Sequence, residues 1–523
     1  MRDYHGLRSS RAPHRLSFAL ERGGVVVQDH SGPPHSLHMA CPGAEFRPNQ
    51  DWWYRFIYRQ DIARGQDGVE DLYTPGAFEL ELEDGRCCQF TASRDGPAEI
   101  DFDGAVRRRT AAMAELAASA GEQADDATRR LAIATDAFLA ARESPDVAAP
   151  PEATGHAWGP LPGQTVLAGF HWFADWGRDT FISLPGLLLA TRRFDRARRV
   201  FATFARSMSD GMVPNRFDEY GGTPHYNSID ASLWFILAAE RYMEAAADHD
   251  FWASTLMPAC DRILTAYRDG TLFDIRADSD GLLAGGSQHT QLTWMDVSLG
   301  QEVITPRHGR PVEVNALWHF AHRAMQKRCA GSSDEMSRRY GRLADQIGPA
   351  FAKAFWNERA GCLYDCLPEG WPADGSIRPN QIIALALPYC PLTREQQASV
   401  LKVVTEQLLT PYGLRTLAPS DGRYRRRYGG SWESRDRAYH QGTVWAWLIG
   451  PYVDALLNVE GDTPQTRQRA REVLSAFDAH LSEAGIGFIS EVFDGDPPHS
   501  PGGCIAQAWS VAEVLRAKLR VGR

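Results

Sequence analysis

Two carboxyl residues in the sequence are surrounded by residue types that suit acid–base chemistry. Asp296 ends the run 293–296, in which tryptophan and methionine precede it, and Glu491 ends the largely apolar stretch 487–491. Hydrolysis of a glycosidic bond requires two carboxyl groups, one to protonate the leaving oxygen and one to activate water or attack carbon. Apolar neighbours should raise the pKa of Asp296 and keep it protonated as an acid, and Glu491 could hold the water as a base. Sequence spacing alone does not establish that these two form the pair.

A third carboxyl residue, Asp179, directly follows Arg178. If the two side chains also pair in space, Asp179 should stay ionised and would suit hydrogen bonding to sugar hydroxyls better than acid catalysis. Aspartate is also a favoured N-cap residue, so Asp179 could instead cap a helix that begins near residue 180. The two interpretations are compatible.

Tryptophan is abundant, with 15 residues in a chain of 523. Flat ring faces beside hydrogen-bonding side chains are what a sugar needs, because its C–H faces stack on indole while its hydroxyls pair with charged or amide groups. A single tryptophan belongs more often to a core than to a binding platform. Six of them stand beside Asp, Glu, Arg, His or Gln, which favours binding: Trp172, Trp176, Trp294, Trp432, Trp445 and Trp509.

Charge and missing motifs disfavour several other classes of protein. The formal net charge of −10 disfavours nucleic acid as a partner, because phosphate binding requires a basic surface, and it suits a neutral substrate. The sequence has no GxSxG elbow, no GxxxxGK(S/T) phosphate loop, no GxGxxG and no HExxH. Its nine cysteines lack the paired CxxC pattern of a zinc site, so we expect free thiols and neither a metal nor a cofactor.

The ends and apolar runs of the sequence bear on its location. The N-terminus lacks the apolar stretch of a signal peptide, and no apolar run is long enough to cross a bilayer. We therefore expect a soluble, cytoplasmic protein that does not bind membranes. The sequence does not determine the oligomeric state.

Composition divides the chain into three parts. Short alternating segments such as 24–28 and 78–82, separated by Pro, Gly and Asp, predict an antiparallel β-sandwich. From about Val106 the composition favours helix, and the Pro- and Gly-rich stretch 144–163 is typical of a loop or linker. The helix of this middle part could belong to the mainly α domain that follows. The predicted parts are residues 1–110, 111–163 and 164–523.

Apolar residues at helical spacing predict twelve helices between residues 125 and 520. They lie near 125–143, 180–190, 194–208, 228–246, 250–268, 312–329, 332–357, 378–388, 394–408, 440–457, 464–483 and 505–520. A segment rich in aromatic, acidic and amide residues precedes every second helix. These segments are 171–180, 225–230, 293–313, 377–381, 439–445 and 491–509. The alternation predicts six helical hairpins in a ring, an (α/α)6 toroid whose rich segments meet at one mouth; the alternative is an irregular helical domain with unrelated loops.

Seven motifs in this part of the chain resemble, in the same order, the glucosidase domain of glycogen debranching enzymes, the amylo-α-1,6-glucosidases of glycoside hydrolase family 133. The motifs lie at 171–187, 293–296, 305–318, 378–381, 410–417, 439–445 and 507–510. Seven ordered matches are highly specific, whereas the run GRDT at 177–180 alone would not be.

The resemblance implies an (α/α)6 barrel and metal-free hydrolysis, with inversion, of α-1,6-linked glucose stubs on limit dextrin or glycogen. By motif position the general acid falls on Asp296 and the general base on Glu491, which should stand roughly 6.5–9.5 Å apart. Arg178 and Asp179 match residues that grip the non-reducing glucose in glucoamylase-like barrels. The other expected substrate-binding residues are Trp172, Asp230, Trp294, His440, Gln441, Trp445 and Trp509.

The N-terminal part is similar to the β-rich domain of the bacterial and archaeal members, through residues 4–7 (YHGL) and 73–78. Those members have a further stretch before the YHGL segment, and this chain begins almost on it. We therefore expect either a misassigned start or missing first strands. The separate glucanotransferase domain of the eukaryotic enzymes has no counterpart in the sequence.

Other functions fit parts of the same pattern. The fold could serve an exo-α-1,4-glucosidase of glucoamylase type or a trehalase-like enzyme. A phosphorylase on this barrel would bind phosphate where the base sits, which the presence of Glu491 disfavours. A non-catalytic glucan-binding protein would need the tryptophans but neither Asp296 nor Glu491.

Overall fold

The computed structural model describes residues 7–12, 14–21, 23–30, 35–64, 67–85, 87–94, 96, 101–142, 163–170, 172–218 and 222–522. The chain divides into two compact units, Met1–Glu115 and Leu116–Arg523. The predicted linker 144–163 lies outside the described residues, apart from Gly163 at its end. Residues 4–6 of the YHGL segment and His171 also lie outside them.

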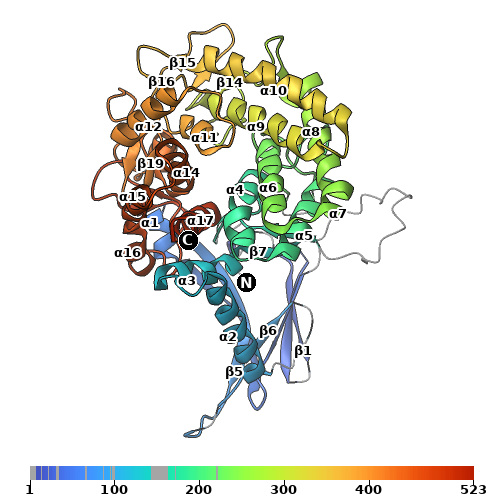
Figure 1. Ribbon diagram of the computed structural model, residues 1–523. Coiled ribbons are helices and arrows are strands. Elements are labelled where there is room, and N and C mark those ends of the chain that lie inside the picture. The colour runs from blue at the N-terminus through green and yellow to red at the C-terminus, as the bar shows by residue number, and fades with distance from the viewer. Residues whose placement is uncertain are drawn as a thin grey trace. The chain divides into compact units, whose positions relative to one another are not determined.

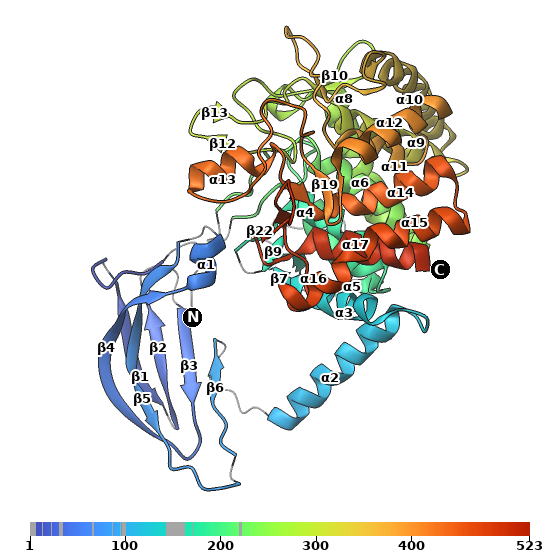
Figure 2. The same ribbon diagram turned by 90° about the vertical axis from the view of Figure 1, so that its left-hand side faces the viewer.

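The first unit contains two antiparallel β-sheets (Figure 2). One has the strand order β1-β2-β3-β6, and the other pairs β4 with β5. The bounds are β1 Leu16–Glu21, β2 Gly24–Asp29, β3 His35–Ala40, β4 Glu45–Ile57, β5 Val69–Glu79 and β6 Thr91–Ser93, with helix α1 at Arg59–Arg64. The ring of Phe18 on β1 meets that of Phe46 on β4 edge to face, with centroids 6.4 Å apart, so apolar side chains join the two sheets.

The predicted antiparallel β region is therefore present. Segment 24–28 lies within β2 as expected. The predicted strand 78–82 is only partly correct, because β5 ends at Glu79 and the next residues form no strand.

The second unit is largely helical (Figure 1), and each of the twelve predicted helices has a counterpart. The α-helices of this unit are α3 Asp126–Ala134, α4 Gly177–Leu184, α5 Phe194–Arg206, α6 Ala231–Ala246, α7 His249–Phe251, α8 Met257–Asp269, α9 Val312–Cys329, α10 Asp334–Phe355, α11 Gln381–Ala386, α12 Arg394–Leu408, α13 Trp432–Tyr439, α14 Ile449–Glu460, α15 Pro464–Leu474, α16 Ala476–Glu483 and α17 Ala508–Gly522. Helix α2, Phe102–Ser119, begins in the first unit and ends just inside the second. Helix α13 was not predicted, because most of its residues are polar and it has no apolar stripe, with Ala438 as its one buried residue.

Six of these helices make a closed series of contacts. Helix α4 packs against α6, α6 against α9, α9 against α11, α11 against α14, α14 against α17, and α17 against α4. Helices α10, α12 and α15 pack on the outer side of this series, α10 on α9, α12 on α11 and α14, and α15 on α14 and α17 (Figure 1). The six rich segments of the sequence each lead into one of the six helices of the closed series.

Burial explains which helices lie inside. All eight residues of α4 are buried, and α6 buries residues all around its axis. By contrast, α10 buries residues such as Tyr340, Ala344, Ile347 and Phe351 at helical spacing, which is a single face. A helix that is apolar all round must be covered on every side, whereas an amphipathic helix can border water.

Short strands, which the sequence did not predict in this part of the chain, lie between the helices. A five-stranded antiparallel sheet contains β18 Leu409–Thr410, β19 Gly413–Arg415, β20 Val444–Trp445, β21 Val492–Phe493 and β22 Pro501–Gly502. The other pairs are β7 Leu139–Arg142 with β8 Gly163–Val166, β9 Gly169–Phe170 with β23 Ala506–Gln507, β10 Arg276–Ala277 with β11 Leu283–Ala284, β12 Ser298–Leu299 with β13 Glu302–Val303, β14 Arg310–Pro311 with β17 Cys366–Leu367, and β15 Trp356–Asn357 with β16 Cys362–Leu363. The pairing of Trp445 with Val492 brings the segment 439–445 beside Glu491.

Two further properties concern the described residues as a whole. None of their helices combines the length and apolar character needed to span a lipid bilayer. The cysteines are free thiols, as the scattered spacing predicted.

Candidate active site

Arg178, in the first turn of α4, binds two carboxyl groups at once. Its Nε donates to both oxygens of Asp230, at 2.8 and 2.9 Å, and its Nη1 donates to Oδ2 of Asp296 at 3.1 Å. The hydroxyl of Ser228 also donates to Asp230, at 2.7 Å. Asp230 stands at the start of α6 and Asp296 in the loop before α9, so three predicted site residues meet although they come from different elements.

Asp296 combines an accessible side chain with a raised pKa. About a third of its side chain, 32%, is exposed, although protein atoms surround the carboxyl group closely enough to keep much of the water away. This desolvation is the largest cause of the raised pKa; the charge of Asp230 adds to it, and Arg178 opposes it. The carboxyl group therefore holds its proton more strongly than an ordinary aspartate, as the apolar neighbours in the sequence predicted.

Glu491 is almost completely buried, and two donors hold its carboxylate. The hydroxyl of Tyr439 donates to Oε1, and the backbone N–H of Cys504 donates to Oε2 at 2.6 Å. Gly503 has a φ of +61°, and a Cβ atom there would lie 2.2 Å from Oε2 of Glu491. Glycine is therefore needed both for the backbone conformation and for the close approach of the carboxylate.

The charges of Asp296 and Glu491 influence the pKa of the same two residues, Asp179 and Tyr439. The negative charges of both raise the pKa of Asp179, and the charges of both also raise the pKa of Tyr439. Electrostatic interactions of this kind fall off with distance. The two carboxyl groups predicted as a pair therefore belong to one cluster with Asp179 and Tyr439.

The expectations for Asp179 were wrong on two counts. Among the described residues no ion pair joins it to Arg178, whose guanidinium binds Asp230 and Asp296 instead. Burial then raises the pKa of Asp179 to about 8, and the charges of Asp296 and Glu491 add to this against the opposing charge of Arg178. It is also not an N-cap, because α4 begins at Gly177 with Trp176 in the capping position.

Three of the six predicted tryptophans, Trp294, Trp445 and Trp509, pack against one another. The rings of Trp294 and Trp445 meet edge to face with centroids 5.4 Å apart, and Trp509 meets Trp445 in the same way at 5.6 Å. Nε1 of Trp294 donates to Asn380 at 2.7 Å. These three and Trp172 are at most 5% exposed, so they form a wall rather than open platforms. Two of the six differ, since Trp432 is 62% exposed on α13 and Trp176 is half-buried.

His440 and Gln441 differ in how far the protein occupies their polar atoms. Burial, with the charges of nearby arginines, lowers the pKa of His440 well below its usual value, so the ring is neutral. It stacks on Trp445 at 5.4 Å, and neither of its ring nitrogens has a hydrogen-bond partner among the described residues. Gln441, in contrast, accepts from Arg378 at 3.0 Å and donates to the carbonyl of Ile304 at 2.9 Å.

Sequence reasoning missed Tyr439 and a second buried arginine. Tyr439 directly precedes His440 in a rich segment, but nothing in the sequence indicates its bond to Glu491. Arg307 binds Glu313 and Asp365 through its guanidinium, with 2.7 Å between its Nε and Oδ2 of Asp365. Tyr439 and Arg307 both lie within motif segments, which was the one available signal.

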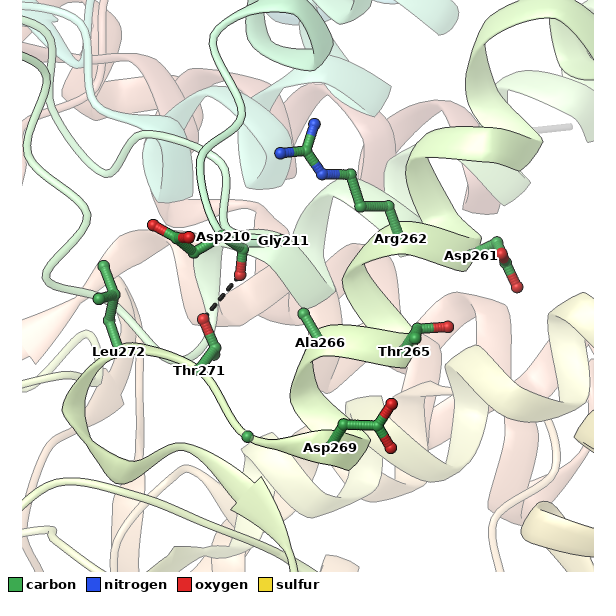
Figure 3. A pocket seen from close by; sticks show the side chains of 10 residues that line it. Asp210, Gly211, Asp261, Arg262, Thr265, Ala266, Asp269, Thr271 and Leu272 are labelled. Carbon is green, nitrogen blue, oxygen red and sulfur yellow. Dashed lines mark hydrogen bonds between the residues drawn. The ribbon is translucent and has the colours of Figure 1, made fainter.

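Two surface pockets lie elsewhere in the second unit. One, of about 800 Å³, is lined by residues around 210–211 and 261–272, where the hydroxyl of Thr271 donates to the carbonyl of Asp210 at 2.6 Å (Figure 3). The other, of about 860 Å³, is lined mainly by residues 385–397. Neither is lined by a predicted site residue. In the part of the chain that the structure describes, no three His, Cys, Asp or Glu side chains are placed to hold a metal ion.

A carboxyl group that holds its proton, a second one bound by two donors and buried aromatic rings are features that hydrolysis of a glycosidic bond requires. Comparison with known families identifies the particular kind of protein. Residues 133–516 match the family model described as amylo-alpha-1,6-glucosidase, and residues 1–88 match the one described as glycogen debranching enzyme N terminal. Because the first match covers well over half of the chain, the chain belongs to the amylo-α-1,6-glucosidase family.

A curated relative agrees with this membership. The glycogen debranching enzyme of Saccharomyces cerevisiae is 28% identical over 414 residues. The match covers 61% of this chain but only 27% of the yeast protein, so the chain corresponds to about a quarter of that relative's length. The resemblance of the motifs to the glucosidase domain of glycogen debranching enzymes is thereby confirmed.

Proposed function

We propose that the protein hydrolyses α-1,6-linked glucose branch stubs of a glycogen-type α-glucan such as limit dextrin, by an inverting mechanism with two carboxyl groups. Membership of the amylo-α-1,6-glucosidase family and the name of the yeast relative, glycogen debranching enzyme, support the reaction and the substrate. Asp296 is the general acid and Glu491 the general base.

The single observation that carries the mechanism is the contrast between these two carboxyl groups. Asp296 is accessible and has a raised pKa, so it can carry a proton to the leaving oxygen. Glu491 is held by two hydrogen-bond donors, which favour an ionised carboxylate that can take a proton from water. Attack of that water on the anomeric carbon from the face opposite the leaving oxygen inverts the configuration.

The other predicted residues serve this pair in different ways. Asp230 binds Arg178, which in turn binds Asp296, so Asp230 acts through the arginine. Arg178 and Asp179 grip the non-reducing glucose, and His440 offers ring nitrogens that no described residue occupies. Trp172, Trp294, Trp445 and Trp509 supply the aromatic part of the proposed site, and Gln441 helps to fix the segment that carries His440.

We also propose the architecture behind this site. The closed series of contacts from α4 through α17 supports an (α/α)6 toroid, with α4, α6, α9, α11, α14 and α17 as its inner ring. The six rich segments would then meet at one mouth, at the N-terminal ends of the inner helices. Residues 164–523 form this glucosidase domain, and the two sheets within residues 1–110 form a β-sandwich.

Release of glucose from phosphorylase limit dextrin, with linear maltodextrin in parallel, tests the proposed function. Glucose from limit dextrin alone is expected, and proton NMR should detect β-glucose first, because inversion converts the α linkage. Glucose mainly from maltodextrin would make the protein an exo-α-1,4-glucosidase of glucoamylase type. Dependence on phosphate would make it a phosphorylase, and silence on both glucans from a protein that melts cooperatively would favour a glucan-binding protein.

A further inference from the structure

The proposed base Glu491 is held at both of its carboxylate oxygens. A backbone N–H, that of Cys504, occupies Oε2, and the hydroxyl of Tyr439 occupies Oε1. The backbone N–H belongs to the main chain, so it would be present with many different side chains at residue 504. The hydroxyl donor is different, because it depends on one side chain 52 residues away from Glu491 in the sequence.

Tyr439 can act only as a hydrogen-bond donor to the carboxylate at any ordinary pH. Burial raises its pKa well above the usual value, and the neighbouring charge of Glu491 raises it further. A phenol that keeps its proton donates a charge-assisted hydrogen bond to a carboxylate, which is stronger than a bond between neutral groups. Such a bond stabilises the ionised form of the acceptor.

The position of Tyr439 is itself fixed by the elements that carry Glu491. Nε1 of Trp445 donates to the carbonyl of Tyr439 at 2.9 Å, and the two rings meet with centroids 4.7 Å apart. Trp445 lies in β20 and pairs with Val492 of β21, the residue that follows Glu491. One strand pairing therefore sets both the phenol and the carboxylate.

We propose that Tyr439 is the positioning residue of Glu491. The hydroxyl of Tyr439 keeps the carboxylate of Glu491 ionised and holds its orientation for the activation of water. This proposal rests on the proposed function, in which Glu491 is the base. Tyr439 acts through its bond to Glu491.

Tyr439→Phe tests the proposal, because it removes the hydroxyl and keeps the ring. We expect kcat to fall about 10- to 100-fold, the range for loss of a hydrogen bond to a charged group, while KM changes little. Without its donor the carboxylate protonates more easily, so the acidic limb of the pH profile of kcat/KM should move to higher pH. Tyr452→Phe is the matched control. Tyr452 lies in α14, and its buried hydroxyl contacts the hydroxyl of Thr405 in α12 at 2.9 Å.

A second variant keeps the test open if the phenylalanine variant does not fold. Replacement of Tyr439 by 3-fluorotyrosine preserves the hydroxyl but makes the phenol more acidic and hence a stronger donor. The acidic limb should then move to lower pH, opposite to its movement in Tyr439→Phe. An unmoved limb in either variant, or a rise in KM with kcat unchanged, would overturn the proposal.

Glu491→Gln separates this proposal from the proposed function. If Glu491→Gln abolishes hydrolysis and Tyr439→Phe resembles the wild type in kcat and pH profile, only the role of Tyr439 is wrong. If Glu491→Gln keeps wild-type turnover, the assignment of the base fails, and with it the role of Tyr439.

Discussion

Two buried arginines in the second unit each bind two carboxyl groups and form a cluster with them. The two clusters differ in the exposure of one carboxyl side chain. In the first, Arg178 binds Asp230 and Asp296. Arg178 and Asp230 are 3% and 0% exposed, but 32% of the Asp296 side chain is accessible. One member of this cluster can therefore meet substrate or water.

In the second cluster, Arg307 binds Glu313 and Asp365, and none of the three side chains is more than 2% exposed. Both of its carboxyl groups form ion pairs with Arg307, so we expect this cluster to stabilise the fold. The two clusters thus differ in whether one carboxyl side chain reaches the surface. The following changes test that difference, from the largest expected effect to the smallest.

Asp296→Asn should have the largest effect, because it removes the accessible proton donor. We expect kcat/KM on limit dextrin to fall by about 10²- to 10⁴-fold with the melting temperature little changed. Asp280→Asn is the control, since it removes a half-exposed carboxylate that binds Arg310 at the surface. Wild-type-like turnover in Asp296→Asn would contradict the assignment.

An activated substrate distinguishes the acid from the base. Fluoride leaves without protonation, so Asp296→Asn should hydrolyse α-glucosyl fluoride much better than limit dextrin, relative to the wild type. Glu491→Gln should hydrolyse neither, because water still needs a base. The opposite pattern would exchange the two roles.

Glu313→Gln should affect stability rather than catalysis. It leaves Arg307 buried with one charged partner fewer, and breaking a buried ion pair costs about 3–5 kcal/mol in the free energy of unfolding. Urea denaturation measures this, and kcat of the folded protein should change less than about twofold. Glu244→Gln removes a partly exposed partner of Arg241 and should cost at most about 1 kcal/mol. A large loss of kcat in Glu313→Gln would show that the clusters are not separate in function.

Asp230→Asn should move the pH profile. The charge of Asp230 raises the pKa of Asp296, and Arg178 lowers it, so removing Asp230 should lower the pKa of Asp296. The acid works only when protonated, so activity is lost as pH rises through its pKa, and the alkaline limb of kcat/KM should move to lower pH. If the pKa falls by about one, the protonated fraction at a pH above it falls about tenfold. Glu313→Gln is the equivalent change in the Arg307 cluster. It should leave the alkaline limb of the kcat/KM profile at the same pH as in the wild type.

Asp179→Asn should change activity least at slightly acidic pH. The pKa of about 8, raised mainly by burial, keeps Asp179 protonated at pH 6, and asparagine resembles that neutral form. We expect kcat/KM at pH 6 to change less than about tenfold. Above pH 8 the wild type ionises and the variant does not, so the two profiles should separate there.

The same substitution should also change the pH dependence of stability. Because the pKa of Asp179 is higher in the folded protein than its ordinary value near 4, folding takes up a proton. The wild type therefore loses stability as pH rises from about 4 to about 8, and the variant lacks this loss. The gain in melting temperature from Asp179→Asn should increase across that window; a constant difference would mean that Asp179 is not the group responsible.

Much of the fold and part of the site were predictable from local pattern. Helices such as α6 and α10 follow from apolar spacing over a single turn or two, which the sequence displays directly. The tryptophans were expected as open platforms, yet Trp294 and Trp445 pack on each other. A ring face is open or covered according to what lies opposite it in space, and that neighbour can come from a distant part of the sequence.

The sequence by itself determined the order of the helices and which segments carry carboxyl, amide and aromatic residues. Only the tertiary structure decided that Arg178 binds Asp296, 118 residues distant, rather than the adjacent Asp179, and that Tyr439 binds Glu491. Helix formation depends on neighbours a few positions apart, so the sequence contains it. A hydrogen bond or a pKa depends on distance and burial in space, which are settled only when separate elements pack together.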